Sequence, residues 1–214
     1  MKPFPVLVLV ALLPLLGGCR SAYYRTLETF GVHKRDLLVE RVEEGKEQQQ
    51  EAQEQFQSTF ERFKAITGVD AGEIETVYAG LAGELERCES EARQVASRIR
   101  GIEAVAGDLF DEWEREIDQL SSPDLRRKSA DKLENSRRTY RGFLAAMKRA
   151  ESTMEPVLVA FRDQVLYLKH NLNARAIADL ESTVLEIEDD VARLIADMQA
   201  SIEEAERFLG TVES

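Results

Sequence analysis

Few residues in this sequence could carry chemistry by themselves. Among its 214 residues it has two histidines, His33 and His170, and two cysteines, Cys19 and Cys88. A zinc site on a helix needs a second histidine or cysteine at i+3 or i+4, and neither histidine has one. The sequence also lacks the patterns of serine hydrolases, zinc proteases, phosphate-binding loops and calcium loops. We therefore predict a protein that is not an enzyme, with no catalytic residues, no cofactor and no metal.

Residues 1–18 have the pattern of a lipoprotein signal peptide. Lys2 is followed by an almost wholly apolar run from Phe4 to Leu16, and two glycines separate that run from Cys19. This order resembles the bacterial lipobox, which implies transfer of diacylglycerol to Cys19, cleavage before it and acylation of the new amino group. The apolar run is shorter than the roughly 20 residues of a membrane-spanning helix, which disfavours the alternative of an uncleaved membrane helix.

The lipobox predicts a protein held on a membrane through acyl chains on Cys19, with residues 19–22 as lipidated cysteine and short tether. Two or three acyl chains give stable attachment. Arg20 stands where an aspartate would favour retention in the inner membrane, so we expect a periplasm-facing protein of the outer membrane. Loss of Lys2 takes the net charge from −12 to −13, which argues against binding to nucleic acid.

After Cys19, apolar residues recur at three- or four-residue spacing over most of the chain, which predicts long amphipathic helices. The pattern is clearest over residues 74–120, where two rows form the seam of a coiled coil. Cys88 lies in this seam, so we expect a buried, unreactive thiol. Asp70 and Glu73 could cap the start of this helix. The rows consist of Ile74, Leu81, Cys88, Val95, Ile102 and Leu109, and of Tyr78, Leu85, Ala92, Ile99, Ala106, Trp113 and Leu120.

The helix that follows residues 74–120 is predicted to begin after Ser122, with that serine as N-cap and Pro123 in the first turn. Its apolar row keeps its phase across Pro156, so we expect a kink between Ser152 and Pro156, with a short break as the alternative. Residues 170–173 are expected to form a tight connection, in which asparagine can adopt a left-handed conformation or cap the next helix. The predicted apolar rows run from Tyr140 to Leu172 and from Ile177 to Leu209.

The first helix, from about Tyr23 to Ile66, has the weakest pattern. Its two ends are apolar, but the stretch from Glu43 to Glu54 is nearly all polar, so we expect that stretch to pack loosely or to face solvent. It is also the candidate interaction surface of the chain. The candidate residues are Glu43, Glu44, Glu47, Gln48 and Glu51.

Short connections make consecutive helices antiparallel neighbours. The predicted fold is therefore all-α, an elongated antiparallel bundle of about four long helices with coiled-coil character, and residues 23–214 form one domain. The helix after Pro123 is basic near its start and lies between acidic neighbours. We expect its bases Arg126, Arg127, Lys128 and Lys132 to pair with acids at the end of the preceding helix rather than with lipid head groups.

Several strings resemble the domain-of-unknown-function 2959 family of bacterial lipoproteins, over almost all of residues 23–209. The resemblance implies a cell-envelope location but no activity and no catalytic residues. The strings are Gly31–Asp36, Val39–Val42, Met154–Leu158, Phe161–Val165 and Leu168–Ala174.

Two functions remain open from the sequence. The first is a non-enzymatic, lipid-anchored periplasmic scaffold or interaction protein, which binds an envelope protein or forms a homo-oligomer through its long seams. The alternative is a ligand-binding or envelope-stress-sensing module with a cavity between helices, near the predicted kink at Pro156.

Overall fold

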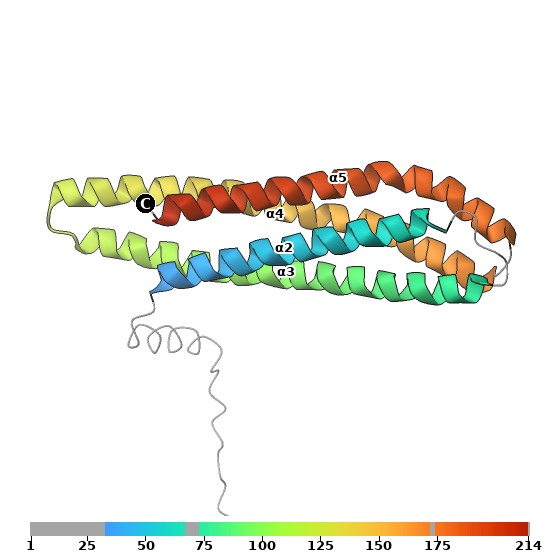
Figure 1. Ribbon diagram of the computed structural model, residues 1–214. Helices are drawn as coiled ribbons and strands as arrows, with labels where there is room; N and C mark the ends of the chain where they lie inside the picture. Colours follow the sequence, from blue (N-terminus) through green and yellow to red (C-terminus); the bar gives the residue numbers. More distant parts are fainter. Residues whose placement is uncertain (1–32, 67–72, 172–173, 214) are drawn as a thin grey trace, which may run out of the picture.

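The chain folds into a bundle of long antiparallel helices (Figure 1). The computed structural model describes residues 33–66, 73–171 and 174–213. Helix α2 spans Lys34–Lys64, α3 Ile74–Gln119, α4 Pro123–His170 and α5 Ala174–Glu213, and these described ranges contain no strand. The predicted signal peptide, Cys19 and the start of the expected first helix lie outside them. No helix within them has an apolar stretch long enough to cross a membrane.

The four helices form a ring around one core. Helix α3 packs between α2 and α4, and α5 packs between α4 and α2, so each helix contacts two neighbours along its length. Successive helices run in opposite directions (Figure 1). The predicted all-α, up-down-up-down bundle is therefore confirmed.

The core contains the apolar rows that the sequence predicts. Leu85, Ile99 and Val165, one or two from each of the two longest helices, are all at most 9% exposed. Tyr78, Ala92, Leu109, Trp113 and Leu120 are exceptions, because they are only partly buried.

Aromatic rings join the helices across the core. Phe161 of α4 stacks on Phe63 of α2 with ring centroids 4.7 Å apart, and Phe143 of α4 stacks on Phe208 of α5 at 5.6 Å. Burial of such large side chains is a main source of the bundle's stability.

The middle of α2 packs more tightly than its sequence predicts. Gly45, Gln48, Gln49 and Ala52 are all buried. A Cβ atom on Gly45 would lie only 2.8 Å from Cδ1 of Ile102. The expectation of loose packing was therefore wrong, because the glycine at position 45 lets α2 approach α3 closely where a larger side chain would not fit.

The connection between α3 and α4 is capped as predicted. The Ser122 hydroxyl accepts a hydrogen bond from the backbone N–H of Leu125 at 3.4 Å, and Pro123 occupies the first turn. Helix α4 then continues without interruption through Pro156, so the alternative of a break is wrong. At the other end of α4, Asn171 has φ −131°, so it does not adopt the left-handed conformation, and its side chain donates to the Tyr167 carbonyl. Asp70 and Asn173, the other predicted caps, lie outside the described residues.

Charged pairs connect α4 to α3 as the charge pattern of the two helices predicts. Three bases of α4 pair with three acids of α3 along the bundle. The pairs are Arg137–Glu114, Lys148–Glu103 and Arg162–Glu89.

The bases at the start of α4 pair differently from the prediction. Arg127 and Lys128 bind Asp124 of their own helix, at 2.8 and 2.9 Å, and Arg126 donates to the Leu120 carbonyl. The prediction of partners at the end of α3 was wrong, because an acid one turn away on the same helix is closer than the neighbouring helix. Lys132 makes no ion pair within the described residues.

Candidate functional site

The two histidines lie too far apart to share a ligand. His33 immediately precedes α2, and His170 is the last residue of α4. In this antiparallel bundle those positions are at opposite ends. Among the described residues, no group of three or more His, Cys, Asp or Glu side chains is arranged to hold a metal ion.

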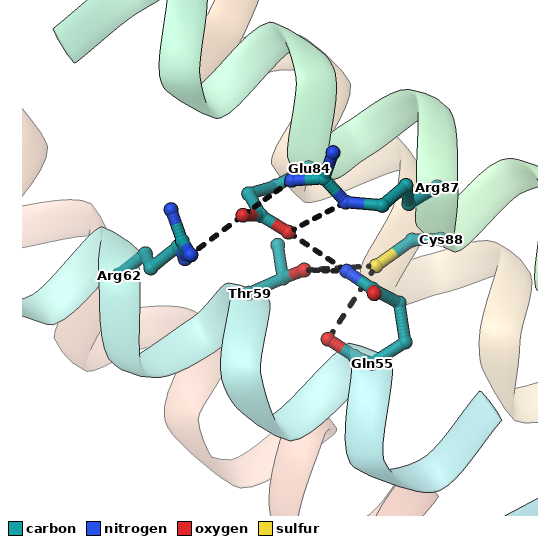
Figure 2. Close-up of polar contacts among 6 residues, drawn as sticks. All are labelled: Gln55, Thr59, Arg62, Glu84, Arg87 and Cys88. Carbon is teal, nitrogen blue, oxygen red and sulfur yellow. Dashed lines mark hydrogen bonds and ion pairs between the residues drawn. The ribbon is translucent and has the colours of Figure 1, made fainter. Parts of the chain in front are cut away.

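A group of four polar side chains lies between α2 and α3, three of them buried and one, Gln55, partly buried (Figure 2). Gln55 and Thr59 of α2 face Glu84 and Cys88 of α3, and each pair is spaced four residues apart so that both members lie on one helix face. The Thr59 hydroxyl lies 3.1 Å from the Cys88 sulfur, and the Gln55 amide donates to Oε2 of Glu84 at 2.8 Å. We call these four residues the polar layer.

Glu84 carries the only charge within the polar layer and is 2% exposed. Arg62 of α2 lies 2.8 Å from its Oε1 atom, and Arg87, one turn further along α3, contacts both carboxylate oxygens (Figure 2). Burial by itself raises the pKa of Glu84, but the hydrogen bonds from Arg87 and Gln55 and the charge of Arg62 outweigh it and lower that pKa overall. The carboxylate therefore stays ionised and is held by groups from both helices.

The Cys88 thiol is buried, as predicted. Its residue is 0% exposed, and burial raises the pKa of the thiol to about 11. A nucleophilic cysteine needs the opposite conditions, namely exposure and a lowered pKa.

What the polar layer can do is fix the packing of α2 against α3. A sliding movement of either helix would leave the Glu84 carboxylate buried without its partners, which is strongly unfavourable. Sequence reasoning missed this layer. The only local signal was an acid at position 84 between two seam residues, Leu81 and Cys88, so that it had to lie at the edge of the core.

The candidate interaction surface on α2 is divided between the two sides of the helix. Gln48 is 5% exposed and donates to Glu91 of α3, and Glu44 pairs with Arg98 of α3 at 2.8 Å. Glu43, Glu47 and Glu51 are exposed. The structure thus places two of the five residues in the packing between helices and three on the outer surface.

The exposed glutamates belong to a longer stripe. We call it the acidic face of α2, and it lies opposite the buried row of that helix. Within the described residues, Glu40, Glu43, Glu47 and Glu54 make no ion pair. The acidic face consists of Glu40, Glu43, Glu47, Glu51 and Glu54.

Residues 23–212, which include every described helix except the last residue of α5, match a family described as a protein of unknown function. The chain belongs to the DUF2959 family. It matches no curated protein. The resemblance found in the sequence is therefore confirmed over nearly the whole chain. The bundle, the polar layer and the acidic face are thus features of a DUF2959 protein.

The described part of the DUF2959 bundle has several hollows large enough for a small molecule. The first, of about 610 Å³, is an open groove between α3 and α4 beside Pro156, with Met154 and Leu158 in its lining and charged side chains such as Arg93 and Arg162 around them. The second, of about 530 Å³, lies where α2 begins and α5 ends, and its lining includes Trp113.

Proposed function

We propose that this DUF2959 protein is a lipid-anchored, non-enzymatic scaffold of the cell envelope that binds a partner protein through the acidic face of α2. The lipobox before Cys19 supports the anchor. The long, continuously packed bundle supports a role as a rigid spacer, because its core runs through all four helices.

The observation that carries the proposal is the unpaired charge on the acidic face. Like charges four residues apart on a helix destabilise it slightly. Glu43, Glu47 and Glu51 follow one another at this interval, and Glu47 and Glu54 are one heptad apart. A partner with lysine or arginine side chains at matching spacing would relieve this repulsion and gain ion pairs. The partner is therefore a protein with a basic surface.

Charge reversal tests the proposal directly. A variant with Glu43→Lys, Glu47→Lys and Glu54→Lys is produced from the full-length gene beside the unchanged protein. Partners are fixed in living cells by chemical crosslinking and identified by mass spectrometry. The variant should lose most of the crosslinked partner. The amount of partner crosslinked to the unchanged protein should fall as the salt concentration of the medium rises.

A matched control separates the acidic face from net charge alone. Glu75 and Glu86 of α3 and Asp189 of α5 are exposed acids without an ion pair in the described part of the chain, so reversing these three changes the net charge by the same amount. The control should keep the partner. Equal recovery with all three proteins would remove the acidic face from consideration.

The groove beside Pro156 supports a second candidate function, binding of a small ligand. Its volume of about 610 Å³ falls in the range of ligand pockets. Its rim holds both acids and bases, including Glu89 and Arg162, which suits a small zwitterion or polar metabolite. A bound ligand raises the melting temperature of the protein. A thermal shift screen with such compounds tests this function, and a Leu158→Trp variant, which fills the groove, should abolish any shift.

A further inference from the structure

The outer side of α4 carries bases that the described bundle does not neutralise. Residues 135–150 include five bases and no acid. Two of these bases, Arg137 and Lys148, pair with acids of α3. The other three are exposed and make no ion pair within the described residues, although Arg138 donates to the side chain of Asn135. We call Arg138, Arg141 and Arg149 the basic face of α4.

The basic face of α4 and the acidic face of α2 lie on opposite sides of the bundle. Helices α2 and α4 both pack against α3 and α5, so they are diagonal to one another in the ring. The residues of both faces are exposed and point away from the core. The two faces of one molecule therefore cannot reach each other, whereas the acidic face of one molecule can meet the basic face of a neighbour.

The charges of the two faces have matching spacing. The three bases of the basic face are separated by three and then eight residues. Glu40, Glu43 and Glu51 of the acidic face are separated by the same two intervals. Ala145 lies halfway along the longer interval of bases and is exposed, so its small side chain leaves room for Glu47, which holds the matching place on α2. Because α2 and α4 run in the same direction (Figure 1), two bundles side by side in one orientation bring the rows together in register.

The two rows also lie at nearly the same height along the bundle. Each base of the basic face is 98 residues after its matching glutamate. Across the core, Phe161 of α4 stacks on Phe63 of α2, which is also 98 residues earlier. The contact of Gly45 with Met147 spans 102 residues, and that of Phe56 with Phe161 spans 105. The rows are thus offset by at most seven residues, or about 10 Å on a helix, so two neighbouring bundles can match them with a small slide.

We propose that the partner of the acidic face is a second copy of this chain, docked through its basic face of α4 in a parallel orientation. This inference rests on the proposed function, in which the acidic face is the binding surface. After one such contact, each copy still has one face free. The contact is therefore heterologous, and it repeats into a row of rods instead of closing a dimer.

Net charge opposes this docking, and local pairing favours it. The full chain has a net charge of −12, so two copies repel each other at long range. At physiological ionic strength, exposed charges more than about 8 Å apart are largely screened, whereas partly buried pairs at a contact are screened much less. Exposed ion pairs are individually weak. The contact therefore depends on several pairs at once and on copies that are held close together, as lipid anchors on Cys19 would hold them.

Disulfide trapping between two copies tests the docking. One full-length copy carries Glu47→Cys, a second copy with a different tag carries Ala145→Cys, and cells with both copies are oxidised and analysed by non-reducing gel electrophoresis. The control uses Ala200→Cys in the second copy. Ala200 is also an exposed alanine, and it lies at a similar height on α5, where Glu204 faces Gly142. A mixed dimer should form with position 145 and be much weaker with position 200.

Charge exchange tests whether the two faces pair directly. In the copy with the cysteine at position 145, Arg141→Glu and Arg149→Glu should abolish the mixed dimer. Glu43→Arg with Glu51→Arg in the other copy should then restore it. All four positions are exposed, so the bundle should stay folded, which circular dichroism checks.

Other results would overturn the docking. Equal or absent crosslinking at positions 145 and 200 would exclude it, and so would a charge exchange that fails to restore the mixed dimer. If the acidic face still captures a different protein in the charge-reversal experiment above, the proposed function stands and only the second copy is excluded as its partner. If the acidic face captures nothing, both proposals fail.

Discussion

Replacing Glu84 by glutamine should destabilise the bundle at neutral pH, although the two side chains have nearly the same shape. The carboxylate accepts hydrogen bonds from Gln55 and Arg87 and forms an ion pair with Arg62. The amide of glutamine keeps one acceptor oxygen but points an N–H group at groups that are themselves donors. The substitution therefore takes away an acceptor from these donors at a side chain that is itself only 3% exposed.

The size of the effect follows from burial. A hydrogen bond to a charged group contributes about 1.5–3 kcal/mol, whereas an exposed ion pair contributes about 0–1 kcal/mol. The Glu84 side chain is 3% exposed, but those of Arg62 and Arg87 are 62% and 55% exposed, so water screens part of each pair. We expect the free energy of unfolding to fall by about 2–3 kcal/mol, and the melting temperature of a protein of this size by about 4–12 °C.

Urea unfolding followed by circular dichroism measures this difference. Glu86→Gln is the matched control, because Glu86 is exposed two residues along the same helix and makes no ion pair among the described residues. It should change the free energy of unfolding by less than about 0.5 kcal/mol. A loss with Glu84→Gln no larger than with Glu86→Gln would refute the assignment of a structural role to the polar layer.

The pH dependence gives a second test of the same reasoning. The pKa of Glu84 is lowered in the folded protein from its ordinary value of 4.5. A lowered carboxyl pKa contributes stability above the unfolded pKa, and this contribution disappears as the pH falls through the folded value. The free energy of unfolding should therefore be larger for the unchanged protein than for Glu84→Gln by a constant amount near neutral pH. This difference in free energy should become smaller below about pH 4.5. A difference that grows on acidification would contradict the lowered pKa.

Three further predictions follow from other residues. The Cys88 thiol, with its pKa raised to about 11 by burial, should react with iodoacetamide only after the protein is unfolded in urea; rapid labelling of native protein would contradict its burial. Phe161→Ala removes a 0% exposed ring that stacks on Phe63 and should cost about 3–5 kcal/mol in urea unfolding, whereas Val159→Ala, at a 42% exposed position of the same helix, should cost less than about 0.5 kcal/mol. Mass spectrometry of the mature chain from membranes should find Cys19 as the N-terminal residue with diacylglycerol and an acyl group, and Cys19→Ser should release the protein from the membrane; a chain that begins at Met1 would overturn the anchor.

The fold could be predicted from the sequence because burial of apolar side chains acts through local spacing. The two rows of α3 and the row of α4 each define a helix face without knowledge of the rest of the chain. The Ser122–Pro123 cap was equally local, since its hydrogen bond joins residues only three apart.

What could not be predicted depends on how the helices meet. The polar middle of α2 suggested an exposed stretch, but Gln48 finds its partner Glu91 on another helix, 43 residues away. The pairing of Arg62 with Glu84 likewise depends on the register and rotation of α2 against α3, which neither helix encodes alone. The outward direction of Glu43 and Glu47, in contrast to Gln48, became clear only with that rotation.

Site-specific photocrosslinking from the acidic face tests the proposed function most directly. A photoreactive amino acid is placed at position 47 or, as the control, at position 189 of the full-length protein, and cells are irradiated before the crosslinked products are analysed. Our account predicts one discrete envelope protein crosslinked from position 47, lost when Glu43 and Glu54 are also changed to lysine, and little product from position 189. The same products from both positions, or none from position 47, would contradict it.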